Sequence, residues 1–140
     1  MKTYIKRLGI LAGLAAMLVV ATACNFRDNG GGTPAGRRSE RAPIESVDIV
    51  VRESFPPQYG AQIVSGLPSG CAAFEKAEVS ERSGNTITIS VTNTMPSNPD
   101  TVCTAIYGMH ESNVDLGSDF VSGETYRVDV NGTAKEFKAQ

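Results

Sequence analysis

Hydrophobic and polar residues alternate with a period of two through much of the chain after position 43. The clearest run spans residues 86–92, in which Ile and Val alternate with Thr and Ser, and shorter runs occupy 47–52 and 125–130. A period of two is that of a β-strand with one buried side and one solvent-facing side. No stretch combines the length and the period of an amphipathic helix. The sequence therefore predicts an all-β domain.

Turn signals separate these runs. Asn131-Gly132 favours a type I′ hairpin, because both central residues of that turn need positive φ, and Ser83-Gly84-Asn85 marks a second hairpin. Together the signals predict seven strands, at 45–53, 59–66, 72–81, 85–94, 102–110, 124–130 and 133–138. Seven short strands in about 100 residues are typical of an antiparallel, Ig-like β-sandwich. A small closed barrel is the competing arrangement.

The beginning of the chain follows a different pattern. Lys2, Lys6 and Arg7 form a basic segment, and the thirteen residues from Leu8 to Val20 are all apolar. As a helix this run would measure roughly 20 Å, which is shorter than a hydrocarbon core of about 30 Å. Residues 1–23 therefore have the features of a secretory signal peptide rather than of a permanent membrane span.

The signal peptide ends in Ala21-Thr22-Ala23-Cys24, which resembles the lipobox of bacterial lipoproteins. The resemblance implies cleavage before Cys24, diacylglycerol on its thiol and acylation of the new amino group. Ala21 stands where the family usually has Leu. The predicted location is the cell membrane or the outer membrane, lipid-anchored and facing the extracytoplasmic side, and Asn25 would favour the outer membrane in a double-membrane cell. The alternative is an ordinary signal peptide, which would leave Cys24 a plain thiol.

Residues 24–43 are predicted to be a lipidated Cys followed by a flexible tether, because Gly-rich, polar sequence buries too little apolar area to order itself. The folded domain would then span 44–140. Without the leader's three basic residues the chain carries 10 basic against 15 acidic groups, of which the tether contributes +2 and the domain −7. An acidic domain repels phosphate backbones, so no nucleic-acid partner is expected. The basic tether could attract anionic headgroups weakly, or it is simply a solvated linker.

Two segments of the domain are similar to those of a known family. Leu67-Pro68-Ser69-Gly70-Cys71 and the segment 123–132, with its closing Asn131-Gly132, resemble uncharacterised Ig-like domains of bacterial surface lipoproteins. The resemblance covers most of the domain, and it implies a fold and a location but no activity. The Trp that marks the Ig core is missing from this sequence.

The remaining cysteines, Cys71 and Cys103, are predicted to form a disulfide, since paired cysteines in an oxidising compartment normally do. Closing that loop would stabilise the domain by roughly 3–4 kcal/mol. His110 could act as a base for Cys71 only if the two lay together. On a strand at 102–110, Cys103 and His110 point to opposite faces, so His110 is expected to be a lone exposed histidine.

No residue set points to catalysis, and the chain is predicted not to be an enzyme and to need no cofactor. Zinc would require His and Cys ligands that the sequence lacks. The carboxylates of Glu111, Asp115, Asp119 and Glu124 share one loop-rich stretch, but their spacing is not that of an EF-hand. A solvated acidic loop is therefore expected and no metal is predicted, with a bound calcium as the alternative.

The predicted function is a non-catalytic binding module for a protein or glycan, because loops on a rigid scaffold commonly carry recognition. The longest predicted loops are 95–101 and 111–123. The second contains Asp115, Leu116, Asp119 and Phe120, which suit a basic, partly apolar partner. Leu116 and Phe120 could instead plug the end of the sandwich. The alternative function is a protease inhibitor that uses the loops Pro96–Asp100 and Gly117–Gly123.

Overall fold

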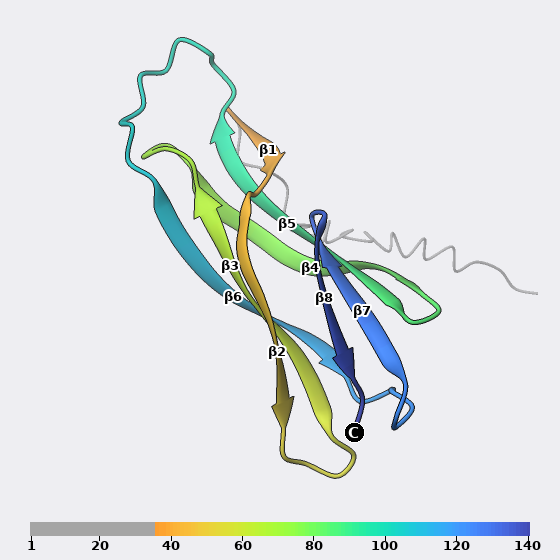
Figure 1. Ribbon diagram of the computed structural model, residues 1–140. Helices are drawn as coiled ribbons and strands as arrows, with labels where there is room; N and C mark the ends of the chain where they lie inside the picture. The colour runs from red at the N-terminus through yellow and green to blue at the C-terminus, as the bar shows by residue number, and fades with distance from the viewer. Residues whose placement is uncertain (1–35) are drawn as a thin grey trace, which may run out of the picture. The chain divides into compact units, whose positions relative to one another are not determined.

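The computed structural model describes residues 36–140, so the predicted signal peptide, Cys24 and most of the predicted tether lie outside the described residues. The described chain forms eight β-strands (Figure 1). They are β1 (Arg37–Arg41), β2 (Ile44–Arg52), β3 (Gln58–Leu67), β4 (Ala73–Ser83), β5 (Thr86–Pro96), β6 (Gly108–Gly117), β7 (Thr125–Val130) and β8 (Thr133–Lys138). Between residues 36 and 140 there is no helix that is long and apolar enough to cross a membrane.

The strands form two sheets, and the predicted all-β sandwich is confirmed. The smaller sheet has the order β2-β3-β6 and is antiparallel throughout. In the larger sheet, β4 pairs with β5 along one side of that strand. The other side of β5 is shared, because β1 pairs with residues 92–96 and β7 pairs with residues 86–89. The sandwich has eight strands rather than the predicted seven. It is not wholly antiparallel, because the β5–β7 pairing is parallel.

The core lies between the sheets and is built from alternate positions of the strands, as the period of two predicts. Ile87, Ile89 and Val91 of β5 are almost completely buried, while Thr88 and Ser90 between them are partly exposed. Buried residues of the other strands complete the core: Val47, Tyr59, Ala61, Ile63, Val114, Leu116, Tyr126, Val128 and Val130. The predicted hairpin at Asn131-Gly132 is also confirmed, since both residues have positive φ and join β7 to β8.

The tether predicted to extend to Pro43 is wrong at its end. Residues Arg37–Arg41 form β1 and pair with β5, and Ala42 is buried. This strand has no apolar residue, so the alternation that reveals other strands is absent from it. Its backbone hydrogen bonds and the side-chain contacts of its arginines hold it in place instead.

The strand predicted at 102–110 is also wrong. Residues 97–107 form a connection without strand structure, and β6 runs from Gly108 to Gly117. The inward positions of β6 include His110 and Ser112, and only Val114 and Leu116 among them are apolar. The alternation of apolar and polar residues that marks a strand is therefore incomplete in β6. The loop predicted at 111–123 consequently shrinks to the short connection after Gly117.

The predicted face of His110 changes with the strand. His110 is half-buried rather than exposed, and its ring stacks on Phe74 at 3.9 Å between centroids. Met109 points outward. The prediction failed because it counted parity from Cys103, which lies outside any strand. The stack joins β4 to β6, so His110 links one sheet to the other.

Candidate functional site

The predicted partner-binding residues come together at one end of the sandwich, where β6 ends and β5 begins. A cavity of about 490 Å³ opens there. It is lined by Arg82, Gly84, Ile87, Asp115, Leu116, Gly117, Asp119, Phe120 and Tyr126. We call this cavity the β6-end pocket. All four residues predicted from the sequence line it, although Asp115 and Leu116 belong to β6 itself rather than to a loop.

Two carboxylates form the exposed rim of the β6-end pocket. Asp115 and Asp119 are both exposed. One oxygen of Asp115 accepts a hydrogen bond from the Gly117 N–H at 2.8 Å, which fixes the turn where Gly117 has a φ of 80°. Neither carboxylate forms an ion pair with any residue between 36 and 140. The rim therefore presents two carboxylates that form no ion pair within the described chain, and Arg82 is the cationic residue of the pocket lining.

The apolar members of the predicted set have structural roles. Leu116 is 1% exposed and belongs to the core. Phe120 is half-buried and lies 4.8 Å from the rings of both Tyr59 and Tyr126, and 5.4 Å from that of Phe137. Edge-to-face packing of this kind stabilises aromatic clusters. Phe120 thus plugs this end of the sandwich, and only part of its ring faces the pocket.

Five lining residues lie outside the predicted set, and two of them, Arg82 and Tyr126, have polar side chains that the sequence analysis missed. Arg82 comes from β4, and its Nη2 donates a hydrogen bond to the Leu116 carbonyl at 2.7 Å. Tyr126 comes from β7, and its hydroxyl accepts a hydrogen bond from the Val121 N–H at 3.0 Å. Neither residue is near β6 in sequence. The position of Arg82 beside the Ser83-Gly84-Asn85 turn was the available signal, since it places the side chain at a strand end.

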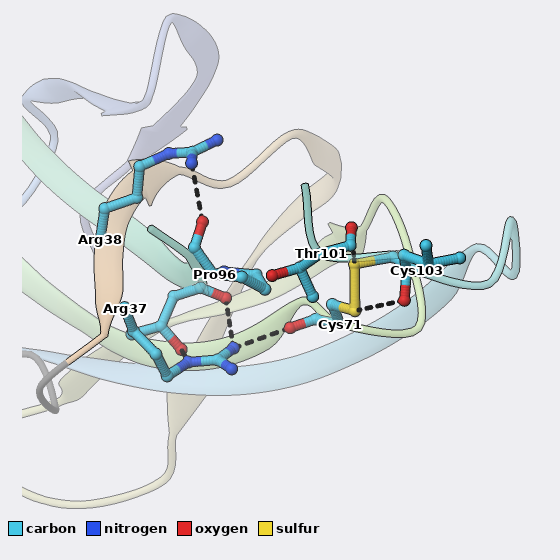
Figure 2. The surroundings of a disulfide bond; sticks show 8 residues. Arg37, Arg38, Cys71, Pro96, Thr101 and Cys103 are labelled. Carbon is cyan, nitrogen blue, oxygen red and sulfur yellow. Dashed lines mark hydrogen bonds between the residues drawn. A yellow bond between two sulfur atoms is a disulfide. The ribbon is translucent and has the colours of Figure 1, made fainter. Parts of the chain in front are cut away.

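The opposite end of the sandwich contains the predicted disulfide, which is confirmed (Figure 2). Cys71 and Cys103 are bonded, with their Cα atoms 5.4 Å apart. Figure 2 shows the Arg37 guanidinium pointing at the Cys71 carbonyl, to which it donates at 2.7 Å. Arg38 donates to the Pro96 carbonyl at 2.7 Å. The disulfide, β1 and the end of β5 thus form one connected region.

Tyr107, four positions after Cys103, is also held in place by a contact far away in sequence. Tyr107 donates a hydrogen bond to a carboxylate oxygen of Glu45. That hydrogen bond, with smaller contributions from burial and from the negative charge of Glu45, raises the pKa of Tyr107 above its ordinary value. A Cβ on Gly66 would lie 1.9 Å from the Tyr107 hydroxyl, so the ring can occupy this place only because residue 66 is a glycine.

Two forms of chemistry can be compared with this geometry. Cys71 is part of the disulfide, so it offers no thiolate for His110 to activate. Among residues 36–140, no three His, Cys, Asp or Glu side chains are grouped so that they could hold a metal ion. The carboxylates of Asp115 and Asp119 lie beside Phe120 and Tyr126 in the lining of the β6-end pocket.

These features define a disulfide-bonded β-sandwich with a pocket at one end. Residues 61–139 match the model of a family described as the ORF11 beta-sandwich domain. This range includes both cysteines of the disulfide and all the residues that line the pocket. The chain belongs to this family. It is 38% identical over 95 residues to an uncharacterised 10.2 kDa protein in the HgiCIIM 5′ region of Herpetosiphon aurantiacus. That alignment covers 68% of this chain and 97% of the relative. No solved structure matches the chain.

Proposed function

We propose that this protein is a membrane-anchored extracytoplasmic lipoprotein whose β-sandwich is a non-catalytic binding module. The lipobox-like Ala21-Thr22-Ala23-Cys24, preceded by a short apolar run, supports lipidation of Cys24 and attachment to the cell membrane or the outer membrane. The Cys71–Cys103 disulfide supports an oxidising, extracytoplasmic location, because such bonds are rare where thiols are kept reduced.

The observation that carries the binding role is the separation of the two ends of the sandwich. Gly36, where the described chain leads back toward Cys24, accepts a hydrogen bond from the N–H of Ser97 just after β5. The β6-end pocket lies beside Ile87 at the start of β5. From Ile87 to Pro96 a strand rises about 30 Å. The pocket therefore lies at the end of β5 opposite to Gly36, and the course of β5 between these two ends can be followed in Figure 1. A partner outside the membrane could reach that end of the domain.

The chemistry of the pocket favours a basic, partly apolar protein segment as the partner. Asp115 and Asp119 would attract lysine or arginine, and the exposed part of Phe120 offers an aromatic contact. A glycan is the other ligand class that such a rim could bind. A protease inhibitor would need its two candidate loops together, but residues 97–100 follow the end of β5 whereas residues 118–123 follow the end of β6, at opposite ends of the sandwich. The binding module is therefore the better proposal.

The anchor is tested by fractionation and intact-mass analysis of the expressed full chain. The wild-type protein should begin at Cys24, carry acyl chains and sediment with membranes. Cys24→Ala should remove the acyl mass and release the protein from membranes. Ala23→Ser is the matched control, because it keeps a small residue before the cysteine and should leave lipidation intact. Membrane attachment of Cys24→Ala equal to that of wild type would contradict the anchor.

The binding role is tested by quantitative capture from envelope extract with the full mature protein. Asp115→Asn/Asp119→Asn should lose the proteins that wild type enriches, because it removes both rim charges at constant shape. Glu53→Gln/Asp100→Asn makes the same charge change at exposed positions outside the pocket, so it should capture like wild type. Equal capture by all three proteins would remove the β6-end pocket from consideration.

A further inference from the structure

The connection between β5 and β6 exposes large apolar side chains. Val102 is 95% exposed and Ile106 is 65% exposed, and Met109, at the start of β6, is 68% exposed. We call these three residues the disulfide-end patch. Single exposed apolar residues are common, but three within eight successive positions, two in the connection and one at the start of β6, call for a physical explanation.

The patch is not a consequence of a loose loop. Cys103, next to Val102, is bonded to Cys71. The N–H of Gly70 donates to the Thr104 carbonyl at 2.9 Å, and a Cβ on Gly70 would lie 2.0 Å from the Thr104 hydroxyl. Tyr107 is held by Glu45. Fixed points at 103, 104 and 107 therefore keep Val102 and Ile106 directed outward, where they cannot fold back into the core.

The patch lies at the end of the sandwich from which the tether leaves. The N–H of Ser97, at the start of the connection, bonds to the carbonyl of Gly36 at 2.9 Å. A small hollow between Arg38 and residues 95–103 shows the same connection lying against β1. Gly36 lies twelve positions after Cys24. A chain segment of that length spans at most about 40 Å even when fully extended, so a lipid on Cys24 keeps this end within that distance of the bilayer.

The basic charge at this end is concentrated in β1, which carries three arginines against one glutamate, whereas the residues from Ile44 onward carry a net charge of −7. Asp100 of the connection, Glu45 beside Tyr107 and Glu75 beside Ser39 bring acidic side chains to the same end. Anionic lipid headgroups attract a basic segment next to the membrane, so β1 is the part of this end that they would hold.

We infer that the disulfide-end patch rests in the interface of the membrane to which Cys24 is anchored, with Val102 and Ile106 among the headgroups and upper acyl chains. The inference rests on the lipid anchor of the proposed function. Shallow insertion of a few apolar side chains is weak by itself, but the anchor turns it into an intramolecular contact at high effective concentration. Its consequence is a fixed orientation, with the β6-end pocket directed away from the membrane.

The sequence contains no Trp, so a single introduced Trp reports its own surroundings. The test uses the full lipidated protein in vesicles of phosphatidylethanolamine and phosphatidylglycerol, some with brominated acyl chains. The fluorescence of Val102→Trp should be blue-shifted, and brominated lipid should quench most of its intensity. Phe55→Trp is the matched control, because Phe55 is fully exposed in the connection between β2 and β3 at the other end. Its emission should be unaffected by bromine.

Vesicle flotation separates the outcomes. A floating Val102→Trp protein that is not quenched would overturn the inference and leave the anchor intact, as would equal quenching of both variants. A blue shift without bromine quenching would also overturn it, since the patch would then be covered by protein, such as a second copy. Failure of the Val102→Trp protein to float, as expected for Cys24→Ala, would contradict the lipid anchor and therefore also the inference. Adding Ile106→Asp to Val102→Trp should weaken the quenching.

Discussion

The side-chain amide of Asn131 hydrogen bonds to both backbone groups of Val91. Its oxygen accepts from the Val91 N–H at 3.2 Å, and its Nδ2 donates to the Val91 carbonyl at 2.7 Å and to the Ala42 carbonyl at 2.9 Å. Val91 lies between Ile89, which pairs with β7, and Thr92, which pairs with β1. The Asn131 side chain therefore fills the gap that two partner strands leave along one side of β5.

Replacing Asn131 with Gly should lower the free energy of unfolding by about 1–3 kcal/mol, because the Val91 N–H and the Ala42 carbonyl lose their side-chain partner in a partly buried place. Glycine keeps the positive φ of the turn, so the loss reports the amide rather than the backbone. Urea unfolding of the lipid-free protein measures the change. Thr133→Ala, at an exposed neighbouring position, is the control and should change the stability little. Equal stability of Asn131→Gly and wild type would contradict this role.

Arg37 and Arg38 offer a matched pair of substitutions on β1. The Arg37 guanidinium donates to the hydroxyl and carbonyl of Thr94 and to the carbonyl of Cys71 in a partly buried place. Arg38 is exposed and pairs with Glu40. Arg37→Ala should cost about 1–3 kcal/mol of unfolding free energy, and Arg38→Ala less than about 1 kcal/mol, as exposed ion pairs do. Thermal or urea unfolding compares the two variants, each of which has lost one positive charge. Equal losses would show that the three partly buried contacts of Arg37 contribute no more than the exposed contacts of Arg38.

The fold was predictable wherever a strand buries apolar residues at alternate positions. β5 and the Asn131-Gly132 hairpin satisfy that condition, and both were predicted from local sequence. β1 was not, because it is stabilised by its neighbour's backbone and by arginine contacts with residues far away in sequence. The bounds of β6 were predicted too early in the sequence, because His110 and Ser112 occupy inward positions that are apolar in an easily recognised strand.

The candidate site was predictable for the segment 115–120 and not for the rest. Asp115, Leu116, Asp119 and Phe120 are adjacent in sequence, and a mixture of acidic and aromatic residues marks them. Arg82 reaches the pocket through the β4–β5 hairpin, whose turn was predicted but not connected with the site. Tyr126 reaches it through the parallel pairing of β7 with β5, which leaves no local signal because the two strands are far apart in sequence.

The contact between Tyr107 and Glu45 predicts a pH dependence. The hydrogen bond raises the pKa of Tyr107, so the folded protein holds this proton more tightly than the unfolded chain, whose Tyr ionises near pH 10. The contribution of this group to stability is therefore complete below about pH 10 and is lost as the pH rises through the folded-state pKa. A difference titration of phenolate absorbance, wild type minus Tyr107→Phe, should have its midpoint above pH 10. Glu45→Gln should lower that midpoint, and an unchanged value would contradict the assignment.

The disulfide should stabilise the domain as a whole but hold only one end of it. Cys71 and Cys103 are 32 positions apart, so removing their bond should lower the free energy of unfolding by roughly 3–4 kcal/mol. In Cys71→Ser/Cys103→Ser, residues 97–107 lose a fixed point, whereas the β6-end pocket is held by the Tyr59–Phe120 and Phe120–Tyr126 contacts. Hydrogen exchange under native conditions should therefore accelerate at 97–107 more than at 112–120. The same acceleration at both ends would mean that the disulfide acts only through global stability, and the disulfide-end patch would then need another support.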